Sequence, residues 1–203
     1  MKIKTAGTRG RAAEKLKCVN LGCGSNLQTS TSEREWINID NYYLPDNKDF
    51  LQGDACDIPL ESNSVDYLLC DQMLEHIKMS DVPVVLYNIK RVLKKGGKAI
   101  IMVPDFEDAV QGWLGFNHNG AFNPMMYTWL SEPIYGNQNH EGEYHKTPMC
   151  AGYLHYVLNM VGLNDHNISF WPRNGAIPKF PGMNSYAQGA TLRNAQLLVE
   201  VVK

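Results

Sequence analysis

Two glycines flank a cysteine in Gly22-Cys23-Gly24, which follows a short apolar run and lies eighteen residues before Asp40. Closely spaced glycines after a strand let the backbone turn sharply and approach a ligand where a side chain would block it. A carboxylate about twenty residues later, at the end of the next strand, is where a parallel α/β sheet binds a ribose. The spacing therefore predicts a site for a cofactor that carries a nucleoside.

Two later strand-like runs also end in polar residues, at Gly53-Asp54-Ala55 and at Cys70-Asp71-Gln72. Open α/β sheets bind ligands at the edge where the carboxyl ends of their strands meet. We therefore expect both groups to lie near Asp40, with Asp54 placed to accept a hydrogen bond from an exocyclic amine. A single aspartate at a strand end is equally well explained as a turn former, so the prediction depends on the ordered set.

The glycine loop lacks parts of a dinucleotide site. Leu27 stands where that fingerprint has a third glycine for close packing of helix on strand. Residues 25–35 are polar and have no apolar helical stripe, so the first crossover helix is predicted to be short or missing. Without that helix there is no amino end to hold a pyrophosphate, which favours a cofactor without phosphates over NAD.

Strand-like runs and helical patterns predict a mostly parallel sheet. The clearest helix covers about residues 81–94, with Ser80 or Asp81 as its cap and Gly96-Gly97 as its stop. It joins two strands in a βαβ unit, whose right-handed crossover makes those strands parallel. A second helix is expected over about residues 148–160. The predicted strands are Lys17–Leu21, Trp36–Asp40, Asp49–Gln52, Val65–Cys70, Lys98–Val103, Asn167–Trp171 and Gln196–Val202.

Residues 105–150 have a different character, with many aromatic, Gly, Asn and His residues. We predict an irregular insertion with a short helix near Pro124–Leu130. Its aromatic residues favour the small core of a cap over a base-stacking platform, since no basic groove accompanies them. Residues 172–191 are predicted to form a loop.

Bulk composition excludes several classes of protein. The 203 residues suit one domain, and a net charge of −2 gives no electrostatic case for binding nucleic acid or a membrane. The basic residues at positions 2–17 favour a frayed terminus over an arm that binds an anionic partner. No apolar run reaches the ~18 residues of a membrane span. Five cysteines without a CxxC pair predict reduced, buried thiols in a cytoplasmic protein.

Together these segments resemble the class I S-adenosylmethionine-dependent methyltransferases, and more narrowly a subfamily of small predicted methyltransferases with a shortened first crossover. The resemblance covers about residues 17–105, half of the chain. The motifs that carry it are Val19-Asn20-Leu21-Gly22-Cys23-Gly24, Ile37-Asn38-Ile39-Asp40, Gly53-Asp54-Ala55, Ile58-Pro59-Leu60, Ser64-Val65-Asp66-Tyr67, Leu74-Glu75-His76, Arg91-Val92-Leu93-Lys94-Lys95-Gly96-Gly97 and Val103-Pro104-Asp105.

The resemblance implies one domain over residues 1–203 with an α/β, Rossmann-like architecture. We expect a mostly parallel seven-stranded sheet with helices on both faces. Residues 17–105 would form the cofactor-binding half, residues 106–150 an irregular insertion over the cofactor cleft, and residues 151–203 a helix and the last strands.

The resemblance also assigns roles in binding S-adenosylmethionine. Gly22, Cys23 and Gly24 would pass under the methionine part, and Asp40 would hold the ribose hydroxyls. Around the adenine would lie Asn41, Gly53, Asp54 and Ala55, and near the transferred methyl would lie Asp71, Gln72 and Met73. One departure is Asn20, where the family usually has an acid that attracts the cofactor's ammonium group.

Two histidines are candidates for catalysis. His76 could take a proton from the substrate, although a role in fixing the turn or the cofactor is favoured. His145 lies in a group with His140, Glu141 and Glu143 whose spacing matches no standard metal motif, so we predict no metal site. His145 belongs to a stretch that resembles an insertion of the narrower family, which makes it a candidate base or substrate contact.

We therefore predict methyl transfer from S-adenosylmethionine to an oxygen or nitrogen nucleophile. The alternative is a non-catalytic module of the same fold that binds S-adenosylmethionine or S-adenosylhomocysteine, and an NAD oxidoreductase is a distant third. The acceptor is expected to be a small molecule or a glycan. The residues after the fourth strand are Asp71-Gln72-Met73-Leu74 rather than Asn-Pro-Pro-Tyr, which disfavours an amino group of a nucleobase.

Overall fold

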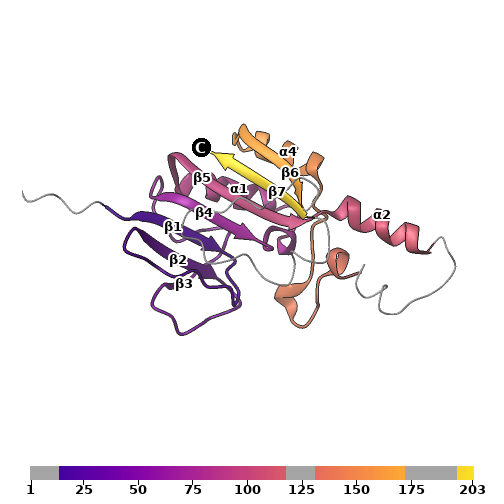
Figure 1. Ribbon diagram of the computed structural model, residues 1–203, viewed down its shortest axis with the longest axis horizontal. Helices are drawn as coiled ribbons and strands as arrows, with labels where there is room; N and C mark the ends of the chain where they lie inside the picture. The colour runs from indigo at the N-terminus through magenta and orange to yellow at the C-terminus, as the bar shows by residue number, and fades with distance from the viewer. Residues whose placement is uncertain (1–13, 118–130, 172–195) are drawn as a thin grey trace, which may run out of the picture.

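A seven-stranded sheet organises the computed structural model, which describes residues 14–117, 131–171 and 196–203 (Figure 1). Its order is β3-β2-β1-β4-β5-β7-β6. Strands β1 to β5 pair in parallel and β7 runs antiparallel to both neighbours, so the predicted mostly parallel sheet is confirmed. The strands are β1 Leu16–Leu21, β2 Arg34–Asp40, β3 Phe50–Gln52, β4 Val65–Asp71, β5 Leu93–Pro104, β6 Asp165–Trp171 and β7 Gln196–Val202.

The larger core cluster joins one face of this sheet to two helices, α1 (Val82–Val92) and α4 (Ala151–Met160). Helix α1 buries the stripe expected from its 3.6-residue period, and α4 packs beside it. The other face carries a smaller cluster that includes Trp36 and Met102, both fully buried. Among the described elements no helix packs on that second face, because the crossovers from β1 to β2 and from β2 to β3 contain none.

The ends of α1 differ from the prediction. Asp81 is the N-cap residue, but its side chain makes no capping hydrogen bond and instead accepts one from the Ser80 hydroxyl at 2.9 Å. The helix ends at Val92, before Gly96-Gly97, because Leu93 is already extended and pairs with Val65 of β4. Gly96 makes a turn within β5 at φ +77°, and its N–H donates to the carbonyl of Lys203 at the end of the chain.

The predicted absence of a helix after the glycine loop is confirmed, since residues 25–33 are irregular in the structure. Asn38 of β2, which is fully buried, holds this segment as a backbone strand would. Its Oδ1 accepts from the Gln28 N–H at 2.8 Å, and its Nδ2 donates to the Gln28 carbonyl at 2.9 Å. Near β2, the Ser30 hydroxyl accepts a hydrogen bond from the Trp36 N–H at 2.9 Å. Polar side chains of this kind hold the segment against β2 in the absence of a helix.

The prediction that residues 105–150 are irregular is wrong at their beginning. Residues Phe106–Asn117 form helix α2, which runs away from the sheet (Figure 1). The Asp105 carboxylate starts it, because Oδ1 accepts from the N–H groups of Glu107 and Asp108 at 3.1 and 3.3 Å. Residues 131–135 are helical too, and Glu141–Glu143 form the short helix η2. The helix predicted near 124–130, the loop at 172–191 and residues 1–13 lie mostly or wholly outside the described residues.

Candidate active site

The glycine loop sits at the carboxyl end of β1 and is fixed to the end of β2. The N–H groups of Gly22 and Cys23 both donate to the Ile39 carbonyl, at 2.8 and 3.1 Å. Gly22 and Gly24 have φ values of +70° and +46°, a region that favours glycine. A Cβ on Gly22 would stand 2.1 Å from Cγ of Met73, so the loop packs directly on the segment that follows β4.

Asp40 at the end of β2 organises the backbone around it. Its Oδ2 accepts from the Gly24 N–H at 2.9 Å, and its Oδ1 accepts from the N–H groups of Tyr42 and Tyr43 at 2.8 and 2.9 Å. The carboxylate is thereby held in one orientation with one acceptor position of Oδ2 left over. This is the geometry expected of a residue that accepts a hydrogen bond from a ribose hydroxyl.

A cavity of about 530 Å³ extends from the glycine loop along the ends of β2 and β3. Predicted cofactor residues that line it are Gly22, Gly24, Asp40, Asn41, Asp54, Ala55, Gln72 and Met73. Gly53 is outside this lining, and a Cβ there would stand 2.7 Å from the ring of Pro59, which indicates a packing role. The Asp54 carboxylate is exposed and accepts from the Cys56 N–H at 2.8 Å.

A second cavity, of about 370 Å³, adjoins the first and shares Gly22, Gly24, Gln72 and His76 with it. Cys23 and Asp71 line only this cavity. Gln72 has a φ of +53°, which is rare for a residue with a side chain, and its Nε2 donates to Oε1 of Gln196 at 2.7 Å. The structure thus brings eleven predicted residues to one edge, with ten of them lining the two cavities and Gly53 just behind.

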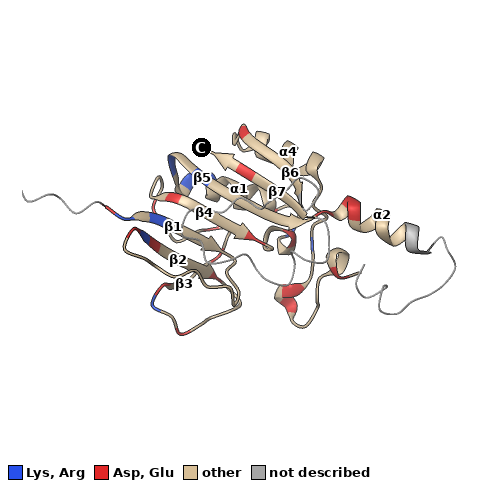
Figure 2. Cartoon of the chain, in the orientation of Figure 1, with Lys and Arg blue, Asp and Glu red and all other residues tan. Residues whose placement is uncertain are grey.

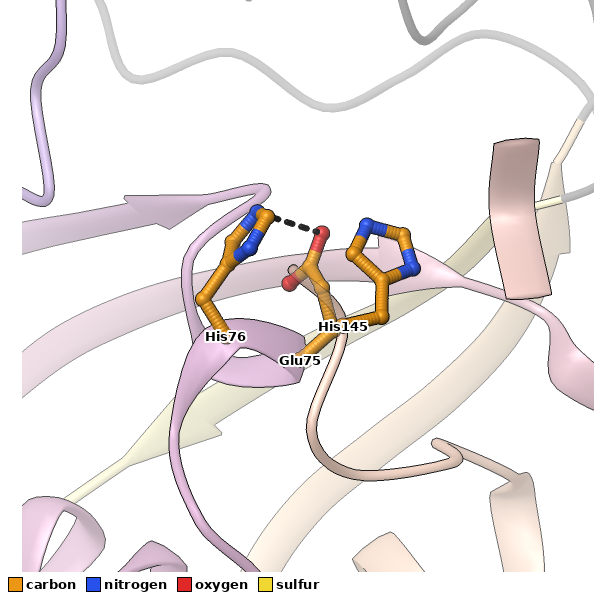
Figure 3. Close-up of side chains that lie close together, drawn as sticks. All are labelled: Glu75, His76 and His145. Atoms are coloured by element: carbon orange, nitrogen blue, oxygen red, sulfur yellow. Dashed lines mark ion pairs between the residues drawn. The ribbon is translucent and has the colours of Figure 1, made fainter. Parts of the chain in front are cut away.

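Glu75, His76 and His145 come together in the smaller cavity, as Figure 3 shows. Glu75 and His76 belong to the short helix η1 (Leu74–His76), and His145 follows η2. The two imidazole rings have centroids 4.8 Å apart, and Nε2 of His76 lies 3.9 Å from Oε1 of Glu75. Within the group at positions 140–145, Nε2 of His140 lies 3.5 Å from Oε1 of Glu143. His145 instead lies beside Glu75 and His76.

Hydrogen bonds from the insertion position this cluster. The Glu75 carbonyl accepts from the N–H groups of Lys146 and Thr147 at 2.8 and 3.1 Å. Nδ1 of His76 lies 3.2 Å from the Tyr144 carbonyl oxygen, and Nδ1 of His145 lies 2.9 Å from that of Pro133. The segment 131–147 is therefore joined to η1 at several points, and residues from both line one cavity.

Burial shifts the pKa of each group in the cluster towards its neutral form. It raises the pKa of Glu75 to about 8, an effect that its own backbone N–H reduces and nearby Asp71 increases. It lowers the pKa of His76 to about 4, assisted by His145. Burial also lowers the pKa of His145, although its hydrogen bond to the Pro133 carbonyl acts to raise that pKa.

Glu75 is the one member of this cluster to which sequence reasoning gave no role of its own. Its side chain is only 2% exposed, and neither carboxylate oxygen has a hydrogen-bond partner among the described residues. The available signal was its position beside His76, directly after a strand that ends at the site. The sequence does not show that this glutamate points inward.

The structure explains why position 20 holds an asparagine, where the resemblance leads one to expect an acid. Its Nδ2 donates to the Asn26 carbonyl at 2.8 Å and to Oδ1 of Asn38 at 3.0 Å. The amide thereby ties β1 to β2 and to the segment without a helix. A carboxylate could not make either bond, because it has no N–H group to donate.

Acidic residues mark the edge of the sheet that holds the site. Figure 2 shows Asp and Glu at the carboxyl ends of β2 and β4 and around η2. The cavities have few cationic lining residues, Lys78 and Lys146, against several carboxylates. The described part of the site therefore offers neither a basic groove for nucleic acid nor a cradle for phosphates.

Comparison with known proteins matches residues 9–101 to the family model described as a methyltransferase domain. Among solved structures, a SAM-dependent methyltransferase from Archaeoglobus fulgidus has a TM-score of 0.55 at 15% identity, over 95% of this chain and 88% of that one. A SAM-dependent methyltransferase from Methanosarcina mazei has a TM-score of 0.55 at 12% identity, over 94% of this chain and 93% of that one. At these identities the structures show the shared fold.

A third similar structure is a Haloferax volcanii methyltransferase in complex with the Trm112 methyltransferase activator. Its TM-score is 0.56 at 18% identity, over 95% of this chain and 84% of that one. A search of curated proteins found no significant match. In the described residues, no helix combines the length and apolar character needed to cross a membrane.

Proposed function

We propose that this chain is a class I S-adenosylmethionine-dependent methyltransferase and that it transfers the methyl group of S-adenosylmethionine to an oxygen or nitrogen nucleophile. The observation that carries the proposal is the pair of adjoining cavities. The larger one is lined by eight of the eleven predicted cofactor residues, and the smaller one holds His76 and His145 beside the glycine loop. Cofactor and acceptor would meet where the two cavities share Gly22, Gly24 and Gln72.

The residues of the larger cavity fit S-adenosylmethionine. Asp40 has one acceptor position left for the ribose hydroxyls, and the absence of a Cβ at Gly24 leaves open space above the loop. Asp54 and Asn41 also line this cavity, and the adenine would lie beside them. The carboxylates along this path suit a cofactor that carries a cationic sulfonium and an ammonium group.

S-adenosylmethionine supplies a methyl group that is already activated, because the sulfonium sulfur leaves as a neutral thioether. The protein's main task is to align the nucleophile with the methyl carbon and the sulfur. Gln72, held in a left-handed conformation and bonded to Gln196, forms part of the wall at the meeting point of the cavities. Residues of the insertion, among them Pro133 and His145, form the wall on the acceptor side.

His76 and His145 would accept the proton of the nucleophile. Each ring has its Nδ1 directed to a backbone carbonyl, which can only accept a hydrogen bond. Each Nδ1 therefore carries the proton, and Nε2 carries a lone pair. A hydroxyl or amine in the smaller cavity can donate its proton to such a nitrogen. A lone pair on the oxygen or nitrogen of that acceptor attacks the methyl group.

The acceptor is proposed to be a small molecule or a glycan. The smaller cavity, at about 370 Å³, is of the size that holds a small ligand. Its lining is rich in amide and carboxylate groups, which suit a substrate with several hydroxyl groups. Residues 106–150 would act as the element that selects this acceptor, since part of them lines the cavity.

Isothermal titration tests the proposal directly. S-adenosylhomocysteine should bind the purified chain with one site per protein, and Asp40→Ala should lose most of that binding. A well-folded sample that binds neither S-adenosylhomocysteine nor S-adenosylmethionine contradicts the proposal. Transfer itself is tested with methyl-labelled S-adenosylmethionine against a panel of sugars, hydroxy acids and amines. Binding without any product across that panel would favour the non-catalytic module.

A further inference from the structure

Two imidazole nitrogens that can only accept hydrogen bonds meet a buried carboxyl group in the smaller cavity. The carbonyls of Tyr144 and Pro133 fix the proton of each imidazole on Nδ1, so Nε2 of His76 and of His145 both carry lone pairs. The Glu75 carboxylate is 2% exposed, and neither of its oxygens has a hydrogen-bond partner in the described residues. Figure 3 shows the three side chains turned towards one another.

A metal cation between these groups would displace the Glu75 proton and bind both nitrogen lone pairs. One ligand atom from each of the three residues lies within 4.8 Å of the other two. Four-coordinate zinc with bonds of about 2.0–2.1 Å places its ligand atoms roughly 3.3 Å apart. Nε2 of His76 and Oε1 of Glu75 are 3.9 Å apart, and the ligand atoms of all three residues lie within 4.8 Å, so side-chain movements of up to about 1.5 Å would close the site.

The surroundings of the histidines are those of metal ligands. A ligating histidine usually donates its other ring N–H to a carbonyl or carboxylate, which fixes the ring and raises the basicity of the ligating nitrogen. Both histidines do this with backbone carbonyls rather than mobile side chains. Backbone bonds of 2.8 and 3.1 Å from residues 146 and 147 to the Glu75 carbonyl hold the two ligand segments together.

We propose that Glu75, His76 and His145 bind a divalent transition-metal ion of the zinc type. Two imidazoles and one carboxylate are a ligand set that suits zinc and leaves a coordination position open. That position would face the cavity lined by Gly22, Gly24 and Gln72. The sequence predicts no metal site in the group at positions 140–145, and only His145 of that group takes part in the site proposed here.

This inference rests on the proposed methyl transfer and narrows its substrate class to acceptors with a hydroxyl oxygen that can bind the metal. Metal binding lowers the pKa of an oxygen ligand, so the acceptor O–H bond breaks with its proton passing to water. The oxygen lone pair then forms the new bond to the methyl carbon, and the S–CH₃ bonding pair stays on sulfur. With the metal bound, both imidazoles act as ligands and no longer as proton acceptors.

The test is a titration of the metal-free full chain with ZnCl₂, and with CoCl₂ read by visible absorption. The exposed pair His155 and His166, with ring nitrogens 2.9 Å apart, could bind zinc adventitiously, so all variants are made in a His155→Ala background. That background protein should bind one zinc ion. Glu75→Gln and His145→Gln should each weaken binding by more than the roughly 10–100-fold typical of losing an outer-shell partner.

Titration of S-adenosylhomocysteine on the same proteins separates this proposal from the proposed function. If the cofactor product binds and zinc does not, the metal site is wrong and the methyltransferase proposal stands. If zinc binds and the cofactor product does not, the metal site stands and the methyltransferase proposal is wrong. Zinc should also raise the melting temperature of the His155→Ala protein but not of either ligand variant, and His76→Gln replaces any variant that fails to fold. Equal zinc affinity in all variants overturns the proposal.

Discussion

The Oδ2 atom of Asp40 accepts a hydrogen bond of 2.9 Å from the backbone N–H of Gly24, so the carboxylate that ends β2 holds the loop that follows β1. The other oxygen of Asp40 is occupied by two backbone N–H groups. Asp40 therefore has two functions, since it shapes the glycine loop and has one acceptor position free for a ligand.

Asp40→Asn keeps the size of the side chain but removes its charge and one of its acceptor oxygens. A hydrogen bond to a charged group contributes about 1.5–3 kcal/mol. We therefore expect the dissociation constant for S-adenosylhomocysteine to rise by roughly 10–100-fold. Titration calorimetry measures this change, and Asp46→Asn, in the exposed loop before β3, is the matched control. Equal affinity in both variants would mean that Asp40 does not contact the cofactor.

Gly22→Ala should destabilise the fold as well as the site. The new Cβ would stand 2.1 Å from Cγ of Met73, in a backbone conformation with φ +70°. Overpacking costs about 1–3 kcal/mol, and the left-handed conformation adds roughly 1 kcal/mol. Urea denaturation should show the sum, and adding Met73→Ala should recover only part of the packing cost, because Cβ of residue 73 would still stand 2.6 Å from the new Cβ. Full recovery in the double variant would contradict the conformational contribution.

Gly24→Ala provides the contrast. Its φ is also left-handed, at +46°, but a Cβ there has nothing within 4 Å. We expect a loss of only about 1 kcal/mol in the free energy of unfolding. Affinity for S-adenosylhomocysteine should nevertheless fall, because the methyl group would project into the cavity that is proposed to hold the cofactor. A variant that keeps full affinity would show that the cofactor does not pass over this residue.

The parts of the fold that depend on local pattern were predictable. The helix at 82–92 has an apolar period that is visible in the sequence, and the strands end in polar residues at the expected edge. Helix α2 was not predicted, because Gly and aromatic residues after Pro104 obscured the capping role of Asp105. Its start is set by one side-chain interaction rather than by periodicity.

The site was predictable to the same extent. Strand ends converge in any parallel sheet, so the cofactor edge follows from the positions of Gly22, Asp40 and Asp54. The cluster of Glu75 with His145 joins residues seventy positions apart through backbone bonds that leave no trace in local sequence. The same holds for Asn20, whose departure from the family pattern has its reason in two acceptors on other segments.

The cysteines should differ widely in their reaction with iodoacetamide. The thiolate is the reactive form, and burial raises the pKa of Cys23 to about 12 and that of Cys18 to about 11. A raised pKa means that the native thiol stays protonated as the pH rises. Cys56 and Cys150 are both only partly buried, and Cys150 should react first because burial and nearby Asp54 raise the pKa of Cys56. Cys18, Cys23 and the fully buried Cys70 should remain unmodified near pH 8.

Peptide mass spectrometry over time, in native buffer and in urea, measures these reactions. In urea the five rates should converge, because unfolding removes the burial that raises the pKa values. The native rate at Cys23 should be low at pH 8, because burial raises the pKa of its thiol to about 12. Rapid native modification of Cys23 near pH 8 would be incompatible with this environment for the glycine loop.

Asn20→Asp restores the acid that the family resemblance leads one to expect, and we predict that it harms this chain. The Asn20 amide donates to the Asn26 carbonyl and to Oδ1 of Asn38, at 2.8 and 3.0 Å. A buried carboxylate would face both oxygens without a proton to offer, at a cost of about 2–4 kcal/mol. Urea denaturation near neutral pH should show this loss, whereas Asn47→Asp on the surface should change stability by less than about 0.5 kcal/mol. Because the acid would disturb the segment that supports the glycine loop, affinity for S-adenosylhomocysteine should not increase. A stable Asn20→Asp variant with tighter binding would instead show that the amide is a weakened form of the family's acid.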